Sequence, residues 1–204
     1  MGLKEKMVYH EGILVSTDEK INAAAVGAEI EGSKLKCRIY RPSDTAENLE
    51  VGVRFTYSLT DDLSLFFKAA LTGRDEPGLS ELSEDEIRRK ENFFYPEEAT
   101  EVFFCKVEEV WEKKIRDEYG SARLKHVVAE IQSKETLREA APLNREESLL
   151  DAMVHASRLP IVDGEQKRTI RKKIDRGLAS VNLDPESREG KIKNKIIDFV
   201  EKWS

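Results

Sequence analysis

The chain has 204 residues, of which 40 are acidic and 34 are basic, so its formal net charge is −6. This balance argues against broad nucleic-acid binding, which needs a positive face that displaces counterions from the phosphates. No apolar run approaches the roughly 20 residues of a membrane span, and no signal-peptide core is recognisable, so we expect a cytoplasmic protein without membrane association.

The first sixty residues have the pattern of short β-strands. Apolar runs separated by turn residues predict strands over residues 12–16, 21–30, 35–40 and 51–59. Short strands joined by tight turns indicate a small antiparallel barrel.

The second predicted strand contains a segment with very little side-chain bulk. Residues 22–27 read Asn-Ala-Ala-Ala-Val-Gly and are called the alanine segment below. A flat ligand could lie against such a backbone, whose N–H and C=O groups can pair with ring atoms at a strand edge. Consecutive alanines also fill a tight barrel corner, and the residues alone leave both interpretations open.

A turn rich in hydrogen-bonding side chains follows the third predicted strand. Residues 41–48, called the Arg41 turn below, read Arg-Pro-Ser-Asp-Thr-Ala-Glu-Asn. Arg41 offers a forked cation, Ser43 and Thr45 offer hydroxyl donors, and a helix starting near Thr45 would add free backbone N–H groups. This chemistry suits a phosphate, although Ser, Asp and Thr before a helix also form ordinary N-caps. On the strand before the turn, Arg38 and Tyr40 share one face, which either reaches the same pocket or faces solvent or a partner.

The middle of the chain combines two predicted helices with two longer strands. Asp61 or Asp62 can cap a helix over residues 63–71, and Ser83 followed by Glu86 has the spacing of a capping box, which predicts an exposed helix over residues 80–92. Strands over residues 101–112 and 124–133, with a turn at residues 118–121, would complete the barrel.

After Pro142 the pattern becomes helical. Asn144 is a candidate cap for a helix over residues 145–159 that ends before Pro160, with Glu147 in the reciprocal position of a capping box. Further helices are predicted over residues 165–178 and 186–203, the last with Asp184 as its cap and Pro185 at its first position.

The remaining candidate reactive residues are isolated. Cys37 and Cys105 lie in apolar strands and are expected to be buried free thiols. No histidine has metal-ligand spacing, so we expect no metal site. No nucleophile elbow, catalytic triad or Gly-rich nucleotide loop is recognisable, and we assign no catalytic residue.

Several segments of the sequence resemble segments that occur in the same order in the FMN-binding split-barrel proteins. More narrowly, they are similar to the archaeal-type family known as domain of unknown function 447, which is related to flavoredoxin-like flavin reductases. That family has an Asn-Ala-Ala strand, a Thr-x-x-Asn turn and an Asn-x-Thr-x-Asp strand end. The matching residues here are 22–24, 45–48 and 58–62, and residues 144–147 and 154–159 resemble the family's helical half. One departure is Ser58, which stands where the family usually has Asn.

The resemblance implies a mainly β fold with a helical C-terminal region. In this interpretation residues 1–142 form an FMN-binding split β-barrel with inserted helices, and residues 143–204 form helices that pack on the barrel or on a dimer partner. Ring and ribityl contacts to FMN fall on Asn22, Ala23 and Ala24. Phosphate contacts fall on Arg41, Ser43 and Thr45, while Asn48 is either a further contact or an anchor of the turn. The family's His-x-x-Arg feature matches His155 and Arg158, for which we prefer a structural or interface role over ligand contact.

The function implied by the resemblance is that of an FMN-dependent oxidoreductase of the flavin-reductase or flavoredoxin type. It would act as a homodimer and transfer a hydride or electrons at flavin N5. Two alternatives stay open: a non-enzymatic flavin carrier or sensor, and a split-barrel scaffold that has lost its cofactor. The sequence does not identify the small molecule or protein that serves as redox partner.

Overall fold

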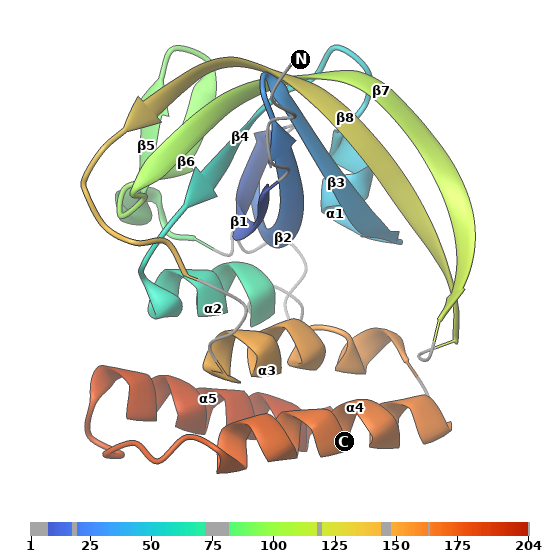
Figure 1. The fold of residues 1–204 in the computed structure, drawn as a ribbon, viewed down its shortest axis with the longest axis vertical. Helices are drawn as coiled ribbons and strands as arrows, with labels where there is room; N and C mark the ends of the chain where they lie inside the picture. The colour runs from blue at the N-terminus through green and yellow to red at the C-terminus, as the bar shows by residue number, and fades with distance from the viewer. Residues whose placement is uncertain are drawn as a thin grey trace, which may run out of the picture.

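A computed structural model describes residues 8–17, 20–71, 82–117, 120–143, 148–162 and 164–203. Six antiparallel strands form the barrel, in the spatial order β1-β2-β3-β8-β7-β4. They are β1 (Val8–Thr17), β2 (Ile21–Glu31), β3 (Lys34–Arg41), β4 (Arg54–Leu59), β7 (Glu101–Asp117) and β8 (Gly120–Thr136). Helices cover one end of this barrel (Figure 1). The prediction of a mainly β fold with a helical C-terminal region is therefore confirmed.

The barrel interior is filled by the inward half of each strand's alternating pattern. Its core includes Leu14 and Val26, with Leu35, Cys37 and Ile39 on β3. The strand predictions located all six barrel strands but misplaced several ends. For example, β4 begins only at Arg54 because residues 50–53 form a turn. The strands β7 and β8 are longer than predicted because they pair with each other as far as Asp117 and Gly120.

Closure between β1 and β4 depends on Gly12. At this position a Cβ atom would lie 2.6 Å from the Tyr57 ring and 2.7 Å from the Ser58 carbonyl oxygen. Tyr57 is fully buried, and its hydroxyl donates to the carbonyl groups of His10 and Val26. Because the space above Gly12 is occupied by this ring and by strand backbone, a larger residue would separate the two strands.

The exposed helix predicted over residues 80–92 is wrong within the part of the chain that the structure describes. Glu86 does accept a hydrogen bond from the Ser83 N–H at 3.0 Å, but only one 3₁₀ turn follows (Glu84–Glu86). Next come β5 (Ile87–Lys90) and β6 (Phe93–Pro96), which pair with each other. Phe93 and Tyr95 of β6 pack edge-on against Phe104 of the barrel. These aromatic contacts hold β6 extended and give residues 87–90 a strand partner, which outweighs the local capping signal.

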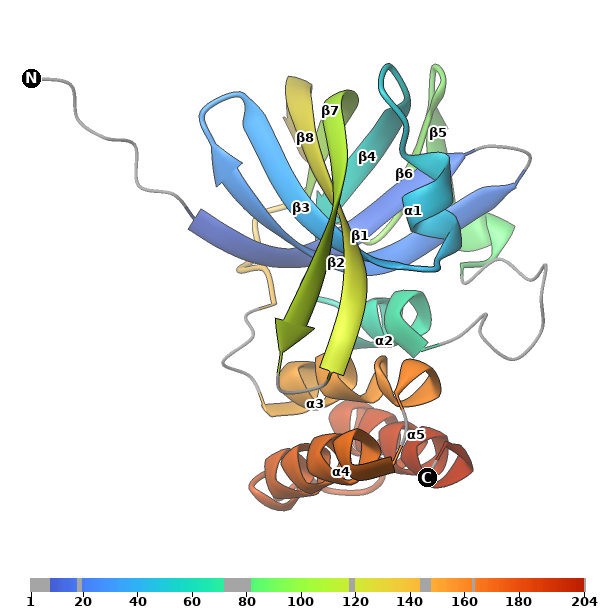
Figure 2. The same cartoon turned by 90° about the vertical axis from the view of Figure 1, so that its right-hand side faces the viewer.

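Helices α2 (Leu63–Leu71), α3 (Ser148–Ala156), α4 (Gly164–Ala179) and α5 (Arg188–Lys202) form two layers below the barrel. In Figure 1, α2 and α3 lie between the barrel and the pair α4 and α5. One hydrophobic cluster runs through these layers into the barrel wall, where it includes Ile13, Val15 and Ala23. Figures 1 and 2 both show the β7–β8 hairpin extending from the barrel to the level of α3. None of the described helices is long and apolar enough to cross a membrane.

The helix ends differ in part from the sequence predictions. Asp62 caps α2, since its Oδ1 accepts from the Ser64 and Leu65 N–H groups. The predicted caps Asn144 and Glu147 lie outside the described residues. The Asp184 cap of α5 is wrong: the helix begins at Arg188, and the Ser187 hydroxyl accepts from the Gly190 N–H instead.

Replacing Gly12 with Ala should lower the free energy of unfolding by about 1–3 kcal/mol, the usual cost of overpacking a filled core. Urea denaturation measures the change. Val51→Ala is the control, because Val51 is 63% exposed and its truncation should alter stability by less than about 0.5 kcal/mol. Equal effects of the two substitutions would contradict the steric role assigned to Gly12.

Candidate functional site

The barrel is split where β2 and β3 diverge. β2 pairs with β1 along its length, from Ile21 to Ile30. Its pairing with β3 covers only Ala28–Glu31 and ends at the pair Ala28 and Cys37. Beyond that point β3 continues against β8 as far as Arg41. Among the described strands, none forms a ladder with residues 21–27 on this side of β2, so the barrel is split there.

The Arg41 turn lies at the open end of this split. It contains Ser43, which caps α1 (Asp44–Asn48): its hydroxyl donates to the Tyr40 carbonyl at 2.8 Å and accepts from the Ala46 N–H at 3.2 Å. The helix is five residues long, so its dipole adds little to anion binding, and it begins one residue before Thr45. The local geometry of Ser43 is thus that of an ordinary N-cap.

A polar network joins the Arg41 turn to the alanine segment. Asn22 Nδ2 donates to Thr45 Oγ1 at 2.9 Å and lies 3.5 Å from Ser16 Oγ, and Asn48 Nδ2 donates to the same Ser16 oxygen at 3.3 Å. Thr45 and Ser16 are both buried. Two segments chosen separately from the sequence are therefore in direct contact, and α1 is tied to both β1 and β2 (Figure 2).

Two cationic side chains lie at the Arg41 turn, Arg41 itself and Lys125 of β8. Arg41 Nε lies 2.9 Å from Glu112 Oε1 on β7. Lys125 on β8 is almost fully buried, and its ammonium donates to the Ala46 carbonyl at 2.8 Å and to the Glu50 carboxylate at 2.6 Å. Sequence reasoning missed Lys125. A signal was present, because Lys125 has the inward phase of a strand whose next inward positions are the apolar residues 127 and 129.

The end of α3 approaches the same region. The Arg158 guanidinium lies over the Tyr40 ring, 5.4 Å from its centroid, which is cation–π distance. His155 is buried, and its Nε2 lies 3.4 Å from Asp151 Oδ2 one helical turn earlier. Arg38 lies on the same outward side of β3 as Tyr40 but is exposed.

The other predicted positions are less accessible. Ala23 is 1% exposed and packs in the hydrophobic cluster shared with the helices, whereas Asn22, Ala24 and Ala25 are partly exposed. Ala23 thus fills the core, as one of the two interpretations predicts, while the use of this segment as a surface for a flat ligand stays a prediction. Ser58 is fully buried on β4, where it pairs with Ile13 and Val102, and is not part of the network at the Arg41 turn.

The cysteines are buried free thiols, as predicted. Burial raises the pKa of Cys37 to about 12 and also raises the pKa of Cys105, so both stay protonated at neutral pH. Within the described ranges, no group of three or more His, Cys, Asp or Glu residues is arranged to hold a metal ion.

The family model described as the N-terminal domain of a protein of unknown function (DUF447) matches residues 10–133. The chain belongs to this family. The match spans β1 to most of β8 and therefore includes the split, the alanine segment and the Arg41 turn. No curated protein shows detectable similarity to the chain.

Solved structures share the fold. An FMN-bound protein of the DUF447 family from Methanosarcina mazei aligns over 98% of this chain and 97% of its own, with 18% identity and a TM-score of 0.62. A flavin reductase domain protein from Arthrobacter sp. FB24 covers 66% of this chain and 82% of its own, with 10% identity and a TM-score of 0.52. Component B of nitrilotriacetate monooxygenase from Bacillus cereus covers 70% and 79%, with 14% identity and a TM-score of 0.51. The split β-barrel predicted for this family member is thus confirmed.

Replacing Thr45 with Val keeps the side-chain shape but removes the oxygen that accepts from Asn22. We expect the free energy of unfolding to fall by about 1–2 kcal/mol, because the part-buried amide loses its better acceptor. Urea denaturation of Thr169→Val, a partly exposed threonine on α4, provides the matched control. If both variants lost the same stability, the Asn22–Thr45 bond would not hold the turn.

Proposed function

We propose that this protein binds FMN in the split between β2 and β3 and acts as an oxidoreductase of the flavin-reductase type. The observation that carries this proposal is the end of the β2–β3 ladder at Ala28, which leaves a split next to the Arg41 turn, together with the 2.9 Å bond between Asn22 and Thr45 that joins this turn to β2. A flat polar ring system and a phosphate need these two kinds of surface close together.

The residues present fit FMN in chemistry. The backbone of Asn22, Ala23 and Ala24 supplies donors and acceptors with little side-chain bulk, and the partly exposed Arg41 supplies a cation with fork geometry. Ser43 and Thr45 already hold the turn through their hydroxyl groups, and Asn48 anchors it to Ser16. In this proposal Arg41 pairs with the phosphate, and the other three residues mainly preserve the shape of the turn.

FMN, when bound, supplies hydride or electron transfer at its N5 atom. The chain's own part is to bind the cofactor, to orient it against the β2 edge and to shield one side of the site with α1. No residue of this chain is assigned a proton-transfer role. We further propose that the protein is a cytoplasmic homodimer with the flavin near the subunit boundary, as the family resemblance implies. Sedimentation equilibrium would measure the molecular mass of the assembly and so test the dimer.

Similarity to the other proteins supports the proposal at two levels. The DUF447 protein from Methanosarcina mazei is described as FMN-bound and aligns with nearly the whole chain. The Arthrobacter protein is described as a flavin reductase domain protein and aligns with two thirds of the chain. The first supports the cofactor and the second supports the class of reaction.

The phosphate contact can be tested by comparing FMN with riboflavin, which lacks the phosphate. Arg41→Gln should weaken FMN binding by about tenfold, the value of one charge-assisted hydrogen bond, and leave riboflavin binding unchanged. Quenching of flavin fluorescence measures both affinities. Arg54→Gln is the matched control, because Arg54 is an exposed strand arginine on β4 and is not part of the Arg41 turn. Equal loss for both ligands, or no loss, would remove Arg41 from the phosphate site.

Anaerobic mixing of the FMN-loaded protein with NADH, NADPH and reduced deazaflavin separates an enzyme from a carrier. An oxidoreductase should show rapid loss of flavin absorbance with at least one donor, and reoxidation by an acceptor should restore the absorbance. No loss with any donor would leave a flavin carrier or sensor. A protein that is colourless and takes up no added FMN would instead be a scaffold without cofactor.

A further inference from the structure

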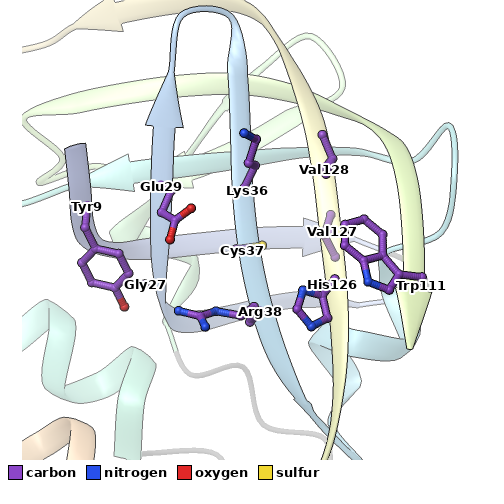
Figure 3. Close-up of a pocket in the computed structure, with 10 residues that line it drawn as sticks. All are labelled: Tyr9, Gly27, Glu29, Lys36, Cys37, Arg38, Trp111, His126, Val127 and Val128. Atoms are coloured by element: carbon purple, nitrogen blue, oxygen red, sulfur yellow. The ribbon is translucent and has the colours of Figure 1, made fainter. Parts of the chain in front are cut away.

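A concavity of about 260 Å³ lies on the outer face of β1, β2, β3, β7 and β8, beside the split. It is called the Trp111 concavity here. Figure 3 shows its principal residues: Tyr9, Gly27, Glu29, Arg38, Trp111 and His126. Of these, only Gly27 also belongs to the alanine segment, so the concavity adjoins the proposed flavin site without including the Arg41 turn.

One wall of the Trp111 concavity is aromatic. Trp111 and His126 are stacked, with ring centroids 5.0 Å apart and planes 13° from parallel. Trp111 is still 47% exposed, which is unusual for so large an apolar side chain. Burial lowers the pKa of His126, and the nearby charges of Arg38 and Lys113 lower it further, so the imidazole is neutral at pH 7. Its Nε2 atom is shielded from solvent and makes no hydrogen bond within the described residues.

The Arg38 guanidinium, which lines the same concavity, has no bonding partner among the described residues. Arg38 is the register partner of His126 and is exposed. Among the described residues, no side chain forms an ion pair or hydrogen bond with its guanidinium. Lys36, two residues earlier on the same face, is in contrast bound to Glu31 at 2.9 Å. Figure 3 shows the Arg38 side chain extending from β3 toward β2, so the guanidinium and Trp111 lie on opposite sides of the concavity. Together they are the two components that bind an aromatic acid.

The opposite side of the Trp111 concavity limits the size and charge of a ligand. Tyr9 lies over Gly27 so closely that a Cβ atom on Gly27 would be 1.7 Å from the Tyr9 hydroxyl. Glu29 also lines this side, and its carboxylate would repel a second acidic group. The volume is below the several hundred Å³ typical of sites for drug-sized ligands, which favours a compound of one or two rings.

We propose that the Trp111 concavity binds a small planar aromatic monocarboxylate, with its ring against Trp111 and its carboxylate paired with the Arg38 guanidinium. The inference goes beyond FMN binding and does not require it, although a ligand here would lie next to Gly27, at the end of the split. No chemical step is assigned to this ligand.

The probe for this site is 2-naphthoate, added to the full-length protein both without FMN and with FMN. Binding should shift the NMR signal of the Trp111 indole N–H, which Trp203→Phe identifies because the chain has two tryptophans. The neutral amide, 2-naphthamide, should bind at least about tenfold more weakly, since it lacks the charge-assisted bond to Arg38. Cyclohexanecarboxylate, which keeps the acid but not the aromatic ring, should also bind more weakly.

Two substitutions test the assigned contacts. Arg38→Gln should weaken naphthoate binding by about tenfold and bring it to the level of the amide. Trp111→Leu, measured by calorimetry, should weaken naphthoate and amide alike. Arg54→Gln again provides the matched control and should bind naphthoate as the parent does. If Trp111→Leu fails to fold, Arg38→Gln and the amide still decide the question.

Three results would overturn the proposal: no shift of the Trp111 signal, equal binding of acid and amide, or naphthoate binding that Arg38→Gln leaves unchanged. A fall in molecular mass of Arg38→Gln by sedimentation would instead assign the concavity to a contact between two copies of the chain. Binding in the absence of FMN keeps this test separate from that of the proposed function, because Arg41→Gln should not alter naphthoate affinity.

Discussion

The divergence of β2 from β3 is the constraint on which the rest of the site depends. If the β2–β3 ladder continued beyond Ala28, residues 21–27 would pair with β3 and no gap would separate the two strands. Separation creates a second problem, because an unpaired strand edge is mobile unless something else holds it. The Asn22–Thr45 bond and the contacts of Ser16 with Asn22 and Asn48 hold the start of β2 against α1 and β1.

Charge at the Arg41 turn is balanced rather than left in excess. Lys125 is buried against the Ala46 carbonyl and the Glu50 carboxylate, so its charge is compensated within the turn and it also occupies the C-terminal end of α1. Arg41 pairs with Glu112, whose side chain is more exposed than that of Arg41. The side chains of this pair are only partly exposed, at 26% for Arg41 and 44% for Glu112. In the proposed function a phosphate would take the place of Glu112 beside Arg41, whereas Lys125 is committed to the structure.

Much of the fold could be read from the sequence because periodicity and turn residues report directly on local structure. The six barrel strands and the helices α2 to α5 followed from such patterns. The hairpin of β5 and β6 did not, because the helical capping signal at Ser83 and Glu86 is local while the contact of Phe93 with Phe104 is distant in sequence. At the site, composition identified the alanine segment and the Arg41 turn. The divergence of two neighbouring strands leaves no mark on the residues of either strand, so the split could be seen only in three dimensions.

The hydrophobic cluster beneath the barrel has a consequence for how this protein can change through evolution. Ala23 contributes its side chain to that cluster and lies on the strand that borders the split, so one residue connects the helical layers with this strand. A change in the packing of α2 or α3 that required a larger side chain at position 23 would also displace this part of β2. The helices and the split are therefore expected to vary together among relatives, and grafting the barrel alone onto another protein would carry over the residues around the split without the helices that support them.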